Sequence, residues 1–234
     1  MHVTAAPLRR EDGFTLAEML IAFVVGIIVM LAAFALLDMS NGLARSVDDR
    51  VDTTQHARDA MEQITRELRS QVCLKPGIAA IANGQDSSVT FYSYEGDPTK
   101  SYVPERHTIT WNPATRSLVD YVFIGNGAPP DTTYPGTATR TITLAKNVDP
   151  VTGTPIFRYY TWASSGPVNP SLALPTPLSA ADAQRLVRIS VQFRVTPAGN
   201  GQHSAKQNTA MQSDVFARTA DPNASGGPGL PDCG

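Results

Sequence analysis

An uninterrupted apolar segment near the start of the chain constrains its fold more than any other feature. Residues 19–37 read MLIAFVVGIIVMLAAFALL and contain no charged side chain. As a helix that rises 1.5 Å per residue, this segment would span roughly 28 Å, which is close to the thickness of the hydrocarbon core of a bilayer. No second segment of this kind follows. The sequence therefore predicts one membrane-spanning helix near the N-terminus.

The charges beside this segment indicate how it is oriented. Arg9 and Arg10 precede it, and basic residues favour the cytoplasmic side of a membrane. We therefore expect the N-terminus to be cytoplasmic and the bulk of the chain to be exported.

Glu18 lies one turn inside this otherwise apolar helix. An ionised carboxylate is costly there, so such residues are usually paired or functional. An ordinary secretory signal would be cut after an apolar core of about 7–15 residues, and residues 33–35 (AFA) imitate such a site. That core is too long, however, and Glu18 stays unexplained. A plain single-pass anchor also leaves Glu18 without a role.

The residues before the apolar segment carry a more specific signal. The run GFTLAE at residues 13–18, followed directly by the apolar helix, closely resembles the class III signal of type IV prepilins and pseudopilins. The resemblance implies that a prepilin peptidase cuts between Gly13 and Phe14 and N-methylates Phe14. It also implies that Glu18, the fifth residue of the mature chain, neutralises the amine of a neighbouring subunit during assembly. In low-dielectric surroundings that attraction is much stronger than in water.

A helical pattern continues beyond the apolar segment. Leu43, Val47 and Val51 recur every four residues, and an apolar stripe with spacings of three and four follows at residues 57–72. The sequence KPG at residues 75–77 favours the end of the helix. We predict an amphipathic continuation that ends near residue 75, with its weakest point at residues 40–42.

The remaining residues predict a β-rich head. The clearest strand is at residues 187–195, where apolar and polar side chains alternate. Residues 112–116 are typical of a turn that joins two strands into a hairpin, and residues 180–185 predict a short helix. Loops are predicted at residues 125–138, 146–155 and 163–180. Further strands are predicted at residues 89–94, 107–111, 118–123, 140–144, 156–162 and 214–218.

Only two cysteines are present, Cys73 and Cys233. In an exported domain they are compatible with one disulfide, which would tie the C-terminal tail to the end of the long helix. The alternative is a pair of unconnected thiols. We predict no metal site and no cofactor, because neither cysteines nor histidines have the spacing that metal ligation requires.

The sequence predicts neither an enzyme nor a nucleic-acid-binding protein. It contains no P-loop, dinucleotide fingerprint, HExxH or GxSxG motif. The formal net charge is −2, whereas phosphate binding needs an excess of clustered Lys and Arg. One region combines arginines with aromatic residues that could stack bases. The alternative is that it is an ordinary part of the head, with a polar strand face beside core aromatics. Its residues are Arg185, Arg188, Arg194, Trp111, Tyr159, Tyr160 and Trp162.

Together these features favour an α+β, pilin-like fold, in which a long N-terminal helix packs on an antiparallel β-rich head. The predicted parts are a cleaved leader at 1–13, a transmembrane or filament-core helix at 14–37, its amphipathic continuation at 38–75, and the head with a coil tail at 76–234.

The resemblance implies a minor pilin or type II secretion pseudopilin, similar to the W-type and J-type proteins with larger heads. Such a chain is a single-pass membrane protein before assembly and part of an extracellular or periplasmic filament afterwards. Its expected partners are the prepilin peptidase, other pilin or pseudopilin subunits and the inner-membrane assembly platform. The alternative is a binding module, an adhesin or DNA-uptake receptor, displayed on such a filament.

Overall fold

The computed structural model of the chain describes residues 15–74, 78–93, 103–127, 131–162, 171–196 and 209–217. The chain divides into two compact units, residues 1–48 and residues 49–234. Helix α1 crosses from one unit into the other, so each unit is described separately.

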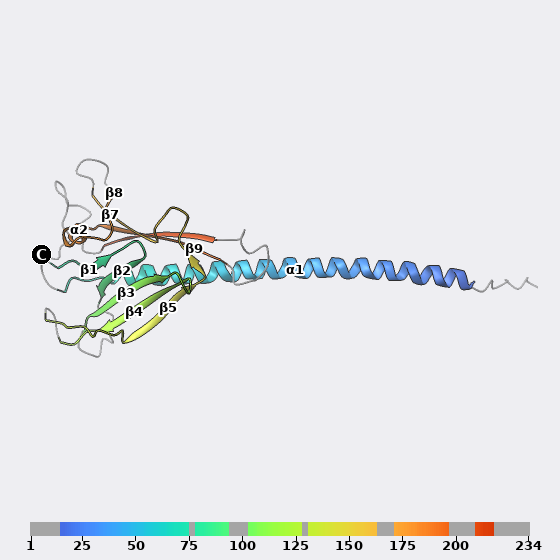
Figure 1. The fold of residues 1–234 in the computed structure, drawn as a ribbon, viewed down its shortest axis with the longest axis horizontal. Helices are drawn as coiled ribbons and strands as arrows, with labels where there is room; N and C mark the ends of the chain where they lie inside the picture. The colour runs from blue at the N-terminus through green and yellow to red at the C-terminus, as the bar shows by residue number, and fades with distance from the viewer. Residues whose placement is uncertain are drawn as a thin grey trace, which may run out of the picture. The chain divides into compact units, whose positions relative to one another are not determined.

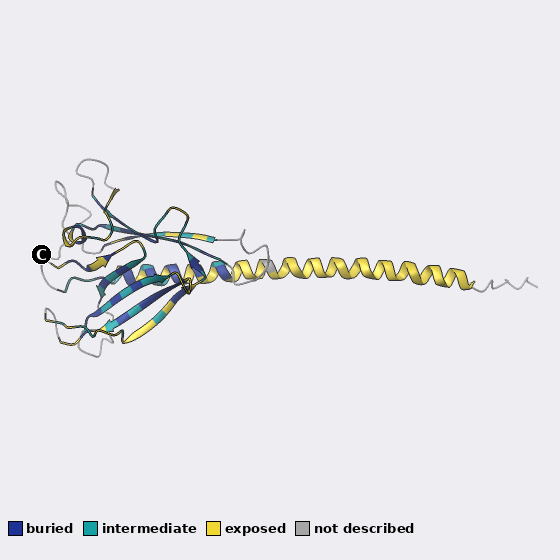
Figure 2. Cartoon of the chain, in the orientation of Figure 1, coloured by how far each residue is buried: buried dark blue, intermediate teal, exposed yellow. Residues whose placement is uncertain are grey.

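The first unit consists, in its described part, of the N-terminal portion of helix α1, which spans Leu16–Arg69. No proline interrupts the sequence of this helix, and α1 is continuous through residues 40–42, where the sequence predicted its weakest point. The residues of this unit whose burial is described are exposed (Figure 2). The most apolar window has a mean hydropathy of 3.1 and none of it is buried, so α1 is long and apolar enough to cross a membrane.

The predicted end of the helix is six residues too late, because α1 ends at Arg69. The backbone N–H of Ser70 is shared between the carbonyls of Arg66 and Glu67, at 3.1 and 3.0 Å. The next residue, Gln71, forms a β-bridge with Ser93. Pairing with a strand that is distant in sequence therefore ends the helix before the KPG sequence is reached.

The second unit contains two antiparallel sheets (Figure 1). The first has the order β1-β2-β3-β4-β5, and the second has the order β10-β9-β7-β8, with β6 paired to β9. The strands of the first sheet are β1 (Ile81–Gly84), β2 (Ser88–Ser93), β3 (Glu105–Asn112), β4 (Ser117–Ile124) and β5 (Arg140–Lys146). Those of the second are β6 (Val148–Asp149), β7 (Phe157–Thr161), β8 (Leu172–Ala173), β9 (Arg188–Val195) and β10 (Thr209–Phe216). This arrangement confirms the predicted α+β fold.

Most predicted elements of the head are present, and the hairpin turn is confirmed. Asn112 Oδ1 accepts hydrogen bonds from the backbone N–H groups of Ala114 at 2.9 Å and Thr115 at 3.4 Å, which is the Asx geometry expected of such a turn. Strands β3 and β4 then pair along their full length. The short helix α2 (Ala180–Gln184) is also present, with the Ser179 side chain accepting from the backbone N–H of Asp182.

Three strands were not predicted: β1, β6 and β8. Strands β6 and β8 contain two residues each and exist through their pairing with β9 and β7. Strand β1 has no alternation of buried and exposed residues, and its register with β2 is interrupted by an irregularity. Periodicity cannot reveal strands of this kind. The prediction of the last strand was also too short, since β10 begins at Thr209.

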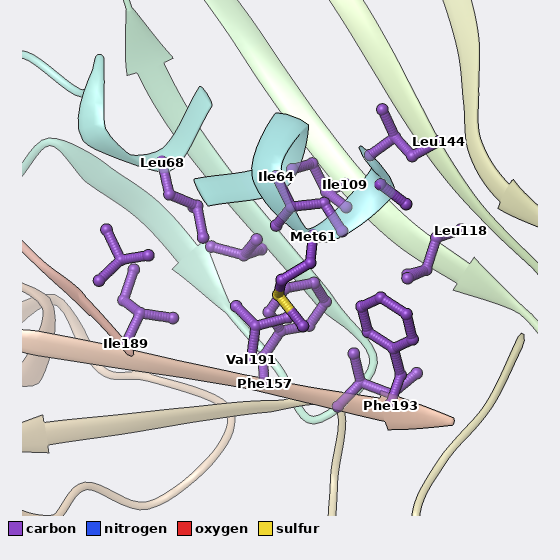
Figure 3. Close-up of a cluster of buried hydrophobic side chains, with 14 of the residues drawn as sticks. Met61, Ile64, Leu68, Ile109, Leu118, Leu144, Phe157, Ile189, Val191 and Phe193 are labelled. Carbon is purple, nitrogen blue, oxygen red and sulfur yellow. The ribbon is translucent and has the colours of Figure 1, made fainter. Parts of the chain in front are cut away.

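The core of the head forms where the C-terminal part of α1 meets both sheets. Met61, Ile64 and Leu68 of α1 are at most 6% exposed. They belong to one hydrophobic cluster with Ile109 and Leu118 of one sheet and Phe193 of the other (Figure 3). The apolar stripe predicted at residues 57–72 is therefore the buried face of the helix, except that Val72 lies beyond the helix end.

Candidate functional site

The first turn of α1 is held by a reciprocal pair of side chains. Thr15 Oγ1 accepts from the backbone N–H of Glu18 at 3.3 Å. In return Glu18 Oε2 accepts from both the backbone N–H and the hydroxyl of Thr15, each at 3.0 Å. This is a capping box, in which two otherwise unpaired donors at a helix N-terminus are satisfied. Gly13 and Phe14, the predicted cleavage pair, lie outside the described residues.

The capping box gives Glu18 a local structural role that the sequence analysis missed. The signal was present, because Thr-x-x-Glu before an apolar run is the sequence pattern of this cap. The structure shows the cap, whereas the pairing of the Glu18 charge with another subunit stays a prediction. An experiment on Glu18 must therefore separate the loss of the cap from the loss of the charge.

The helix that follows the capping box presents apolar side chains on all sides. Phe23 is 71% exposed, and large apolar residues are exposed from Leu16 as far as Val51. A contiguous apolar surface of this size is not stable in water and requires lipid or other protein around it. Glu18 is thus placed at the start of a segment that must be covered.

Residues 8–34 match the prokaryotic N-terminal methylation motif. The matched residues contain the predicted cleavage pair, the capping box and most of the apolar segment. The methylation motif supports a type IV pilin-like precursor that is anchored in a membrane by its apolar helix. It implies cleavage by a prepilin peptidase and assembly with other pilins, and it belongs to structural proteins rather than to enzymes. No match is found among curated proteins.

The methylation motif says nothing about the head, whose most unusual feature is a buried charged cluster. His107 and Asp120 are both 0% exposed, and His107 Nδ1 lies 2.8 Å from Asp120 Oδ2. His107 Nε2 lies 3.4 Å from Glu105 Oε2, and Glu105 also pairs with Arg140 at 3.7 Å. Glu67 of α1 is 7% exposed, and its negative charge acts on His107. The cluster therefore joins α1, β3, β4 and β5.

Sequence patterns do not reveal this cluster, because most of its members are far apart in the chain. Their register explains the arrangement: His107 lies opposite Phe91, and Asp120 lies opposite Ile109, two residues further along β3. His107 also stacks on Phe91, with ring centroids 5.2 Å apart. A His–Asp pair is part of many hydrolase sites, but no substrate reaches side chains that are fully buried. We therefore assign the cluster a role in stability.

The charges around His107 keep it protonated. Burial disfavours the imidazolium, but the hydrogen bond with Asp120, the contact with Glu105 and the negative charges of Asp120 and Glu67 outweigh burial and raise the pKa of His107 to about 9. The ordinary value is 6.5. A pKa that is higher in the folded state stabilises the fold below pH 6.5, and that contribution is lost as the pH rises through 9.

We predict that the head loses about 3 kcal/mol of stability between pH 6.5 and 9.5, from a pKa difference of this size. Urea unfolding of the full chain in detergent, followed by tryptophan fluorescence, measures this loss. Burial raises the pKa of Tyr159 above its usual value, so Tyr159 does not titrate in this range. A His107→Leu chain should show a much flatter pH profile, and an equally steep profile in that variant would contradict the assignment.

Two of the three arginines that could have contacted nucleic acid, Arg185 and Arg188, are engaged within the head. Arg185 Nε lies 3.0 Å from Asp182 Oδ1. The guanidinium of Arg188 lies 4.2 Å from the centroid of the Tyr160 ring, and Arg188 also pairs with Asp214 at 3.4 Å. The charges of Arg185 and Arg188 are therefore largely neutralised within the fold.

Two of the four aromatic residues of the same region, Tyr159 and Trp111, pack and hydrogen-bond within the head. Tyr159 is 1% exposed, and its hydroxyl donates to the backbone carbonyls of Gln85 and Ser88, each at 3.0 Å. Trp111 is partly buried and donates from Nε1 to the carbonyl of Val148 at 2.9 Å. Tyr159 belongs to the hydrophobic core, and Trp111 packs against it.

Cys73 follows the end of α1 and takes part in a disulfide. Its predicted partner, Cys233, lies outside the described residues, so the pairing of these two residues stays a prediction.

Proposed function

We propose that this chain is a minor pilin or pseudopilin. A prepilin peptidase cuts it between Gly13 and Phe14 and methylates the new amine of Phe14. The mature chain is then stored in the membrane through its apolar helix. From there it is assembled into, or at the tip of, a type IV pilus or a type II secretion pseudopilus.

The observation that carries this proposal is the position of the methylation motif. Residues 8–34 match it, and α1 begins within the match at Leu16. The exposed apolar side chains of α1 need either lipid or the helices of other subunits around them. In a precursor that moves from the membrane into a filament core, lipid covers these side chains before assembly. The helices of other subunits cover them afterwards.

The proposed organisation follows from these features. Residues 1–13 form the leader, residues 14–37 the membrane or filament-core helix, and α1 continues beyond residue 37 to Arg69 before the β-rich head begins. The proposed partners are the prepilin peptidase, other pilin or pseudopilin subunits and the inner-membrane assembly platform. The filament that results lies outside the inner membrane.

Another prediction tests the processing step. Expressed with an active prepilin peptidase, the chain should have the mass of residues 14–234, corrected for the disulfide, plus one methyl group. Expressed without the peptidase, it should keep its full length. Replacing Gly13 with valine should block cleavage almost completely, because a branched side chain then occupies the residue whose carbonyl is attacked. Intact-mass spectrometry of the purified protein measures all three species.

Two results would remove the proposal. One is an uncut wild-type chain in the presence of a peptidase that processes a known prepilin in the same cells. The other is cleavage after Ala35, which would make the apolar segment an ordinary secretory signal.

A further inference from the structure

A groove on the head lies between α1 and the edge strand β10. Its volume is about 470 Å³, and Met61 of α1 and Met211 and Ser213 of β10 are among the residues that line it. Thr65 Oγ1 donates to Ser213 Oγ over 3.4 Å, which joins the two elements along the groove. Among the described strands β10 pairs only with β9. The groove is therefore bounded by the helix on one side and by an edge strand on the other.

Arginines dominate the charge of this groove. Arg58, Arg66 and Arg69 line it with a single carboxylate, Glu62. Arg66 pairs with Glu62 at 3.4 Å, so among the described residues Arg58 and Arg69 have no ion pair. We call this feature the basic groove. Its two unpaired guanidinium groups call for two carboxylates from elsewhere.

Another face of α1 carries such carboxylates. Asp48, Asp52, Gln55 and Asp59 are all exposed. They are spaced by four, three and four residues, which places them on one side of a helix. We call these four residues the acidic stripe. Val51, which is 60% exposed, lies beside it.

The acidic stripe and the helical side of the basic groove have the same spacing. The groove residues with this spacing are Arg58, Glu62, Thr65 and Arg69. A parallel second copy, displaced by ten residues or about 15 Å along the helix, places Asp48 beside Arg58 and Asp59 beside Arg69. Both unpaired arginines thereby meet a carboxylate.

The same displacement fits the residues between these two pairs. It places the exposed side chain of Val51 beside Met61, which lines the groove. The one unfavourable pair is Asp52 beside Glu62. Each of these has a partner within its own chain, since Asp52 lies 3.3 Å from His56 and Glu62 lies 3.4 Å from Arg66.

From this match we propose that the basic groove binds the acidic stripe of a second copy of this chain, in parallel and displaced by about ten residues. The contact is heterologous, because each copy offers its acidic stripe to one neighbour and its basic groove to another. Contacts of this type do not close on themselves unless a rotation brings them into a ring, so they extend into a filament. The inference rests on the proposed function, and it favours a subunit present in several adjacent copies.

Cross-linking between full-length chains tests the contact. Two differently tagged copies, one with Asp48→Cys and one with Arg58→Cys, are produced together with the prepilin peptidase and oxidised in the membrane. The second pair, Asp59 with Arg69, is kept in both copies. In the control, the first copy carries Arg50→Cys in place of Asp48→Cys. Arg50 lies two residues after Asp48, which is about 200° further around the helix. Dimers that carry both tags are measured on non-reducing gels.

We expect about tenfold more mixed dimer from the Asp48 and Arg58 pair than from the control, with a decrease at high salt because the ion pairs are exposed. Equal yields from the two pairs, or cross-linking of Arg58→Cys to a protein other than a second copy, would overturn the proposed contact. If the chain is cut at Gly13 and enters filaments in that case, the proposed function stands without this contact.

A charge exchange gives a second, independent measurement. Arg58→Glu with Arg69→Glu should lower the amount of self-association about tenfold. Adding Asp48→Arg and Asp59→Arg to the same chain should restore it, because both pairs are re-formed with reversed sign. A chain with all four substitutions that associates no better than the chain with two would also overturn the inference.

Discussion

Replacing Glu18 with alanine should leave cleavage after Gly13 intact but lower the amount of the chain in filaments by about a hundredfold. Cleavage creates a positive amine on Phe14, and in surroundings of low dielectric an unpaired charge costs several kcal/mol. A loss of about 3 kcal/mol in docking corresponds to a hundredfold weaker association. Quantitative immunoblotting of sheared filaments, with intact mass to confirm processing, measures both steps.

The capping box makes a second variant necessary. Glu18→Ala removes the charge and also the cap on the backbone N–H of Thr15, which is worth about 1 kcal/mol. Glu18→Gln keeps the cap, because glutamine serves equally well at this position of a capping box, and removes only the charge. If charge pairing drives docking, the glutamine chain should fail to assemble almost as completely as the alanine chain.

The opposite result assigns Glu18 a structural role. A glutamine chain that enters filaments normally, while the alanine chain does not, would show that the cap matters and the charge does not. Thr15→Ala is the matched control, because it weakens the same cap and leaves the carboxylate in place. Under the charge-pairing proposal, Thr15→Ala should assemble at close to the normal level.

The second large effect is expected in the buried cluster of the head. Replacing His107 with leucine leaves Asp120 buried without its cation, and removal of one partner from a buried ion pair costs about 3 to 5 kcal/mol. Thermal unfolding of the full chain in detergent, followed by tryptophan fluorescence, should show a clearly lower midpoint. His56→Leu serves as the control, because the His56 side chain is 73% exposed and its loss should change stability by no more than about 0.5 kcal/mol.

A double substitution separates charge from packing. In the chain with His107→Leu and Asp120→Leu, both members of the pair are apolar, and such replacements are often close to neutral. We expect this chain to be more stable than the chain with His107→Leu alone. If the losses of stability caused by His107→Leu and by Asp120→Leu simply add in this chain, the stability comes from the packing of each side chain and not from their charge interaction.

The sequence alone was sufficient to predict the features that depend on residues close together in the chain. They are the apolar segment at residues 19–37, the Thr-x-x-Glu pattern before it and the alternation at residues 187–195. Helix and strand periods therefore predicted α1, the main strands and the α+β class. The motif around Gly13 likewise indicated the pilin-like class, because a peptidase recognises a short continuous segment.

Tertiary structure decided the features that join distant residues. The end of α1 at Arg69 follows from the bridge between Gln71 and Ser93, and strands β6 and β8 exist only through their neighbours. The buried cluster brings Glu67 near His107 and Asp120 because α1 packs across the first sheet. Local sequence patterns cannot predict such contacts, since burial and charge pairing depend on which segments the fold places side by side.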